Sequence, residues 1–285
     1  RHFWADLHGQ SEETIGTNSA RDLIVFARAR AFLDAMSHQG NDFQITTEFW
    51  HELNRLTGEF NRDHEFVIFP GYEWSGNTGL GGDRNVLYLQ EGRPIYRSSH
   101  ALVDDMSDAD TDANSADQLF DALKDEDVIV FAHIGGRYAD ITMSHNAQIE
   151  RSIEIHSDWG TFEWLLADAF AQGYRVGIVA NSDGHKGRHG ASHPGASLFG
   201  AYGGLTCLVA GGRLAVLSFH SLEDRAVKHF IRGEVVHAVR RGPPRAAAAL
   251  APLCAIGKAQ FADAAEVAAN PRARSAVLRI AEKNT

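Results

Sequence analysis

Apolar and polar positions follow two different rhythms along the first two-thirds of the chain. In four segments apolar residues recur every three or four positions, which predicts helices with one buried face at 20–30, 46–60, 115–124 and 161–172. Between them lie short apolar or alternating runs typical of strands, at 3–10, 32–36, 66–69, 85–89, 128–132, 152–156 and 176–180. Strands that alternate with helices favour a parallel α/β fold.

Histidines and carboxylates stand at the C-terminal ends of these predicted strands. After the strand at 176–180, Asp183 and His185 are two positions apart and would point the same way in an extended backbone. One such ending is as typical of a capped turn as of a ligand site. Endings of this kind occur six times in order: Asp6/His8, His38, Glu73, His133, Glu154/His156 and Asp183/His185.

The recurrence of these endings predicts a metal centre. In a closed parallel barrel the C-terminal ends of all strands meet on one face. Convergent imidazoles and carboxylates on that face would bind divalent cations such as zinc, manganese or iron.

Charge divides the chain at about residue 210. Residues 1–210 contain 15 Lys and Arg against 31 Asp and Glu, whereas residues 211–285 contain 12 against 6. The apolar fraction of 44% can supply a substantial core, and no apolar run reaches the roughly 18 residues of a transmembrane helix, so no membrane partner is expected. Cys207 and Cys254 lack the spacing of a disulfide framework or zinc site, which favours a reducing compartment and a cytoplasmic location.

Five motifs together resemble the PHP (polymerase and histidinol phosphatase) superfamily of metal-dependent phosphoesterases, over residues 1–210. The motifs are Trp4-Ala-Asp-Leu-His8, Phe32-Leu-Asp-Ala-Met-Ser-His38, Pro70-Gly-Tyr-Glu73, Phe131-Ala-His133 and Asn181-Ser-Asp-Gly-His185. The resemblance implies an α/β fold of a particular kind, a distorted and incomplete TIM-like β/α barrel with a di- or trinuclear metal centre.

Metal ligands follow from the same resemblance. His8, Glu73 and Asp183 would bind metal, with Glu73 as a bridge. His38, His133 and His185 would complete the site, and the strand-end pattern adds His156 as a further candidate ligand. Gln10 stands where the family usually has a second histidine, and Ser37 where it usually has an aspartate. We therefore expect one or two metal ions rather than three.

The implied reaction is hydrolysis of a small-molecule ester or phosphoester. Bound metal ions lower the pKa of a water molecule and stabilise charge on phosphoryl oxygens. Arg84, Arg137 and Lys186 are candidate catalytic cations that could neutralise those oxygens, and Asp6 is a candidate catalytic carboxylate.

The basic C-terminal part carries a second resemblance. Residues 211–225 and 269–283 resemble the C-terminal part of the MraW/RsmH-type small-subunit ribosomal RNA methyltransferases. A strand followed by a helix is expected at 211–225, as an extension of the barrel. Two domains are expected, a PHP-like segment at 1–210 and a methyltransferase-like fragment at 211–285.

This tail leaves two alternatives to a metal-dependent hydrolase open. The first is an S-adenosylmethionine-dependent rRNA cytosine methyltransferase whose basic tail contacts RNA, although no glycine-rich strand–helix turn of a cofactor-binding domain precedes the tail. The second is a non-functional chimeric fusion, because the join has no Pro- or Ser-rich linker.

Overall fold

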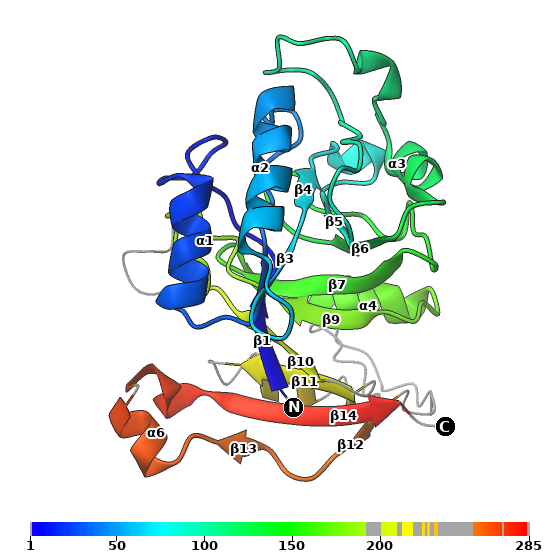
Figure 1. Cartoon of the computed structure of the whole chain (residues 1–285). Coiled ribbons are helices and arrows are strands. Elements are labelled where there is room, and N and C mark those ends of the chain that lie inside the picture. Colours follow the sequence, from blue (N-terminus) through cyan, green and yellow to red (C-terminus); the bar gives the residue numbers. More distant parts are fainter. Residues whose placement is uncertain are drawn as a thin grey trace.

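The computed structural model of the chain describes residues 2–191, 201–209, 213–218, 224–225, 227–228, 231–232, 253–269 and 271–283. It is a mixed α/β structure with two sheets (Figure 1). The described helices are α1 (Ala20–Ala29), α2 (Thr47–Phe60), α3 (Ala116–Leu123), α4 (Glu163–Ala171) and α6 (Ala264–Ala269), with short 3-10 turns η1 (Thr78–Leu80), η2 (Ala109–Thr111) and η3 (Pro271–Ser275). None of these helices combines the length and apolarity that crossing a bilayer requires.

The first sheet joins the N-terminal strands to the C-terminal ones. Its strands are β1 (His2–Asp6), β2 (Ala35–Ser37), β3 (Val67–Phe69), β10 (Leu205–Val209), β11 (Arg213–Ser218), β12 (Leu253–Ala255), β13 (Gln260–Phe261) and β14 (Val277–Lys283). Their order is β12-β14-β11-β10-β1-β2-β3, with β13 also paired with β14. β1, β2 and β3 are parallel, and β10, β11 and β14 continue the sheet in antiparallel steps. The expected domain boundary at residue 210 therefore falls between two paired strands.

The second sheet contains the remaining strands. They are β4 (Gly71–Trp74), β5 (Arg84–Tyr88), β6 (Val128–Ala132), β7 (Glu150–Ser157), β8 (Gly160–Thr161) and β9 (Gly177–Ala180), in the order β4-β5-β6-β7-β8 with β9 beside β7. β6, β7 and β9 are parallel, as the alternation predicted. β4 and β5 are antiparallel, because the chain returns from β4 through the short loop 75–83. β5 and β6 are also antiparallel, although α3 lies between them in the chain.

Two isolated parallel bridges link the sheets at their strand ends. Gly9 pairs with Gly184, just beyond β1 and β9, and Asn41 pairs with Glu73. Within the described residues the hydrogen-bonded ladders form two sheets and not one closed barrel. The bridges nevertheless bring the polar segments after β1 and β9 together, and place Glu73 beside the segment that follows β2.

The helices begin at the residues that their sequences predict, and they bury the predicted apolar faces. The side-chain oxygens of Ser19, Thr46 and Ser115 each accept a backbone N–H three residues ahead, which satisfies a donor at the start of α1, α2 and α3. Their buried side chains join one core with the neighbouring strands, which includes Leu23, Leu53, Leu56, Leu119, Phe120 and Val130.

The strand predicted at 32–36 is shorter than expected. Phe32 has a φ of 56° and is 78% exposed, so it belongs to the turn after α1 and not to a buried strand. β2 begins only at Ala35. A short apolar run cannot by itself show where a turn ends.

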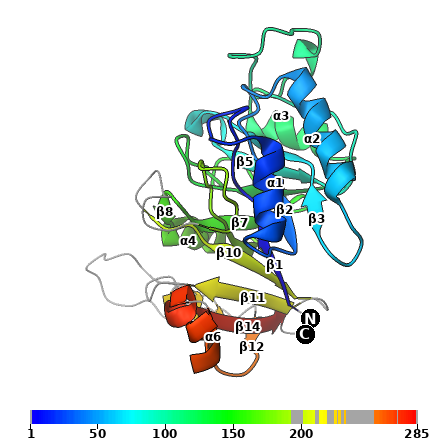
Figure 2. The same ribbon diagram turned by 60° about the vertical axis from the view of Figure 1, so that its left-hand side comes forward.

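The tail contributes more strands than the single strand and helix predicted for 211–225. β11 occupies the first half of that stretch, and β12, β13 and β14 follow later in the chain. In two views this part lies below the rest of the molecule (Figure 2). Val227, Ile231 and Ala281 are buried in the same apolar cluster as Leu166 of α4 and Ile178 of β9. The tail is thus packed against the N-terminal part.

Replacing Ile231 with alanine is expected to destabilise the whole chain by about 2–4 kcal/mol, since it would leave a cavity in this shared cluster. Ile231 is 5% exposed, whereas Ile129 of β6 is 38% exposed and provides a matched control. Urea unfolding, followed by the fluorescence of the tryptophans, all of which precede residue 165, measures both variants. Equal, small effects of the two substitutions would contradict the shared core.

Candidate metal centre

His8 lies at the centre of a buried cluster of imidazoles and carboxylates. It follows β1 and has no exposed surface. Its Nδ1 lies 3.1 Å from Glu154 Oε1, and its Nε2 lies 3.2 Å from Asp183 Oδ1 and 3.6 Å from Glu73 Oε2. Carboxylates from β7, β4 and the turn after β9 therefore converge on one ring.

His133, which follows β6, forms the second half of the cluster. Its ring meets that of His8 edge-on, with 4.5 Å between centroids. Its Nε2 lies 3.4 Å from Glu73 Oε1 and 3.8 Å from Asp83 Oδ2, and its Nδ1 lies 4.0 Å from Glu154 Oε1. Two overlapping groups, His8/His133/Glu154 and Glu73/Asp83/His133, each place ligand atoms within 4.8 Å of one another. His133 is common to both groups.

Asp183 reaches the cluster through a tight turn after β9. Its φ of 49° lies in the left-handed region, which Asp adopts more readily than most residues. Its N–H donates to the His8 carbonyl oxygen at 2.9 Å, which ties the turn to the end of β1. His185 lies beside it, with Nδ1 3.9 Å from Asp183 Oδ1 and 2.8 Å from the Asp183 carbonyl oxygen.

Burial and charge act against each other in this cluster. Burial alone would lower the pKa of His8, but the charges of Asp183 and Glu154 outweigh it and raise the pKa well above its ordinary value. Burial alone would raise the pKa of Glu73, but His133 and His8 together hold that pKa low. The histidines are thus held as imidazolium partners of the carboxylates.

Asp83 behaves differently from Glu73. Burial, together with the nearby charge of Glu73, raises the pKa of Asp83 to about 7, although His133 and Arg137 act in the opposite direction. Crowded carboxylates in a buried site make full ionisation costly. A cation at this position would relieve that cost.

The residues fit a divalent metal ion. Within the described part of the chain, hydrogen bonds do not satisfy His8 Nε2, either ring nitrogen of His133, or Asp183 Oδ1, although all are buried. Buried polar atoms nearly always have a partner, so these atoms are the ones that a bound ion would satisfy. Imidazole nitrogens and carboxylate oxygens are ligands for zinc, manganese or iron.

Neighbouring groups orient the candidate ligands. Asn181 donates through Nδ2 to Glu154 Oε2 at 2.6 Å, and its Oδ1 accepts the N–H of Leu7 at 2.8 Å. Arg137 donates to Asp83 from its backbone N–H at 3.1 Å and from Nε at 3.2 Å. Such outer contacts fix the direction of ligand lone pairs.

Five of the seven predicted ligands lie in or beside the cluster: His8, Glu73, His133, Asp183 and His185. His38 makes other contacts. Its Nδ1 accepts the N–H of Gly40 at 3.1 Å and its Nε2 lies 2.8 Å from Ser11 Oγ, while burial lowers its pKa to about 3. His38 thus stays neutral within a hydrogen-bonded loop.

His156 is also turned to other partners. Its Nδ1 lies 2.8 Å from Thr161 Oγ1 and its Nε2 lies 2.5 Å from the Tyr202 carbonyl oxygen. Residues two apart share a face only in a regular strand, and the register of β7 against β9 shifts between Glu154 and His156. The shift accounts for Glu154, and not His156, reaching the cluster.

The four predicted catalytic residues have different surroundings. Asp6 is buried, and its two oxygens accept the N–H groups of Ser182 and Gly190, so it fastens the turn that carries Asp183. Arg84 is buried against Glu150 and Lys186 is half-buried. Among the four, Arg137 is the one with a hydrogen bond to a carboxylate of the cluster, Asp83, as described above.

Asp83 and Glu154 are not among the ligands predicted from the sequence. Asp83 precedes β5 instead of following a strand, so the strand-end pattern does not include it. Because β5 runs antiparallel to β4 and β6, its beginning lies beside the end of β6. Glu154 carried a usable signal, because it sits two residues before His156 in an alternating strand.

Metal binding is expected to release protons. His8 and His133 have raised pKa values, and a protonated imidazole cannot bind metal. Affinity for zinc should therefore increase as the pH rises above the ordinary histidine value of about 6.5 and fall below it. Calorimetry at pH 6.5 and 8.0, in buffers with different ionisation enthalpies, measures the affinity for zinc and the number of protons released. Affinity and heat that are independent of pH and buffer would contradict protonated ligands.

The C-terminal part of the chain matches a known family. Residues 203–284 match the MraW methylase family. The chain is 59% identical over 81 residues to the ribosomal RNA small subunit methyltransferase H of Thiobacillus denitrificans, and 58% identical over 86 residues to that of Azoarcus sp.. Each match covers 27% of this chain and 25% of the relative. The chain thus spans about a quarter of the length of these relatives, and the resemblance predicted for the tail is confirmed.

Solved structures similar to the chain include PHP-like proteins. A two-domain protein from Bacteroides vulgatus with a PHP-like metal-dependent phosphoesterase has a TM-score of 0.43 and 13% identity, over 66% of this chain and 53% of that one. A metal-dependent phosphoesterase from Bifidobacterium adolescentis has a TM-score of 0.42 and 15% identity, over 66% and 88%. The lesion-specific endonuclease of Pyrococcus furiosus has a TM-score of 0.43 and 11% identity, over 84% and 57%.

Proposed function

We propose that the chain is a metal-dependent hydrolase of ester or phosphoester bonds, built on a distorted β/α barrel. One observation carries the proposal. Two histidines and four carboxylates from separate strands converge in a buried cluster in which three of the four ring nitrogens, His8 Nε2 and both of His133, lack hydrogen-bond partners among the described residues. Groups whose pKa values are shifted away from their ordinary values, as those of His8 and Asp83 are, cluster at functional sites.

The candidate ligands have distinct tasks in this proposal. His8, His133 and Glu154 would hold one divalent ion, and Glu73 and Asp83 would hold a second together with His133. Such ions lower the pKa of bound water and stabilise charge that develops on a phosphoryl oxygen. Burial of the ligands keeps bulk water out, which strengthens these electrostatic contacts.

Arg137 would help to position a phosphorylated substrate. Its side chain is 32% exposed, and its Nε donates to Asp83 at the edge of the cluster. A guanidinium at such an edge can pair with phosphoryl oxygens while it holds the ligand in place.

Metal analysis and hydrolysis assays on the purified chain test the proposal. We expect one or two equivalents of zinc, manganese or iron, and hydrolysis of at least one of p-nitrophenyl phosphate, bis(p-nitrophenyl) phosphate and p-nitrophenyl acetate. Chelation should abolish hydrolysis, and added metal should restore it. A chain without stoichiometric metal, or with activity that resists chelation, would defeat the proposal.

A methyltransferase-related role is the second candidate, and the match of residues 203–284 to the MraW methylase family favours it. Under this proposal the chain would bind S-adenosylmethionine and its basic tail would contact ribosomal RNA. Calorimetry with S-adenosylmethionine, and RNA binding measured as a function of salt, decide the matter. Absence of binding to both ligands would exclude this role.

A further inference from the structure

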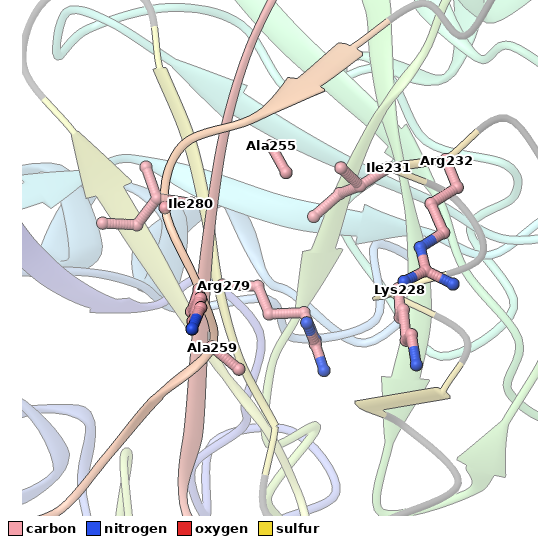
Figure 3. A pocket seen from close by; sticks show the side chains of 9 residues that line it. Lys228, Ile231, Arg232, Ala255, Ala259, Arg279 and Ile280 are labelled. Carbon is pink, nitrogen blue, oxygen red and sulfur yellow. The ribbon is translucent and has the colours of Figure 1, made fainter.

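A basic cavity of about 300 Å³ lies in the C-terminal segment (Figure 3). Its lining includes the cationic residues Lys228, Arg232, Lys258 and Arg279, and no acidic side chain is among its described lining residues. Ile231 and Ile280 contribute apolar surface to the same cavity. A cavity with this lining attracts anions that also carry an apolar part.

Two of the cations occupy neighbouring positions on a helical segment. The N–H of Arg232 donates to the carbonyl oxygen of Lys228 at 3.2 Å, so the two side chains are four residues apart and leave the segment on the same face. In Figure 3 both lie across the cavity from Ile280. Ile231 is 5% exposed and anchors the segment in the shared core. The positions of these cations are therefore set by packing.

Arg279 on β14 forms a fixed part of the wall. Its Nε and Nη2 donate to the two carboxylate oxygens of Asp224, at 2.6 and 2.9 Å. Asp224 compensates that one charge. Lys228 and Lys258 have no carboxylate partner in the described part of the chain, so the cavity retains an excess of positive charge.

We propose that this cavity binds the phosphate of a nucleotide, either free or within a nucleic-acid strand. A phosphate monoester carries a charge of about −1.5 to −2 near neutral pH and accepts several charge-assisted hydrogen bonds, for which Lys228 and Lys258 of the cavity wall are donors. The cavity volume is at the lower end of the roughly 300–1,000 Å³ of ligand pockets, which leaves room for an organic group against Ile231 and Ile280. This site is independent of the proposed hydrolysis, and a nucleic-acid strand bound in it would rest on the RNA contact of the second candidate function.

Binding of a fluorescent ATP derivative to the full chain, followed by anisotropy, tests the site. We expect Lys228→Glu and Lys258→Glu each to weaken binding by at least about tenfold, because each loses one charge-assisted contact and adds a repulsive charge. Removal of each cation should also reduce the slope of log affinity against log salt by about 1. Lys258 is exposed, so its substitution should leave the circular dichroism spectrum and the thermal midpoint unchanged.

Two lysines outside the cavity provide matched controls. Lys124→Glu changes the same charge on an exposed residue after α3, and Lys186→Glu changes it in the loop after β9, near the metal cluster. Neither control should alter binding more than about twofold, because neither residue lines the cavity. If Lys186→Glu weakens binding and Lys258→Glu does not, the nucleotide occupies the metal centre and the proposal is overturned.

Competing ligands define the chemistry and the source. Inorganic phosphate should compete more weakly than ATP, and adenosine should not compete. Equal competition by phosphate would overturn the nucleotide assignment and leave a simple anion site. A single-stranded ten-residue oligonucleotide that competes better than ATP would support a strand as the source, and the reverse order would support a free nucleotide. Hydrolysis at the metal centre should be unchanged by Lys258→Glu, so the two proposals fail separately.

Discussion

Replacing His133 with alanine is expected to lower the affinity for metal by more than about 100-fold, a larger effect than the 10–100-fold typical of outer contacts. His133 belongs to both candidate ligand groups, so its removal weakens both. It also leaves Glu73, Asp83 and Glu154 without the imidazole that lies between them. Metal content after dialysis against a graded series of chelator concentrations measures the loss, and hydrolysis should fall with it.

His156→Gln is the matched control for this result. Like His133, His156 is a buried histidine that the strand-end pattern predicts as a ligand. Its ring, however, contacts Thr161 and Tyr202 and not the cluster. We expect this variant to retain metal within a fewfold of the unsubstituted chain, although it should be less stable. Equal loss of metal in both variants, or full retention in His133→Ala, would show that the cluster is not the metal centre.

Arg84→Met is expected to destabilise the chain by about 3–5 kcal/mol, because it removes the cationic partner of the buried Glu150 carboxylate and leaves that group with His145 as its remaining side-chain partner among the described residues. Arg84 has no exposed surface, and its Nε donates to Glu150 Oε1 at 2.5 Å. Its other nitrogens donate to the carbonyl oxygens of Gly81 at 2.6 Å and Ser144 at 3.1 Å. Urea unfolding at fixed pH measures the free energy of unfolding. Combining Arg84→Met with Glu150→Gln should recover part of the lost stability.

Arg55→Met provides the comparison on the surface. Arg55 pairs with Glu52 and Glu59 on α2, but its side chain is 55% exposed, and solvent screening leaves such exposed pairs little effect on stability. If Arg84→Met costs no more than Arg55→Met and yet abolishes hydrolysis, Arg84 acts on the substrate. The expected large loss of stability instead identifies a buried structural pair.

Much of the candidate site could be predicted from local spacing. A strand that ends in a turn presents its last polar residues at one edge, which is why local spacing predicts that His8, His133 and Asp183 lie together. The helices α1, α2 and α3 were predicted for the same reason, because their caps and apolar periods are local. The resemblance of the tail was equally a property of the sequence.

Contacts between residues far apart in the chain decided the remaining members of the candidate site. A register shift in β7 brings Glu154 to His8, 146 positions away, and leaves His156 outside the cluster. The antiparallel return of β5 brings Asp83 to His133, and burial turns Arg84 from a candidate catalytic cation into the partner of Glu150. Spacing along a chain fixes the direction of a side chain only while the strand stays regular. Which groups it meets depends on how separate strands pack, and that is a property of the tertiary structure alone.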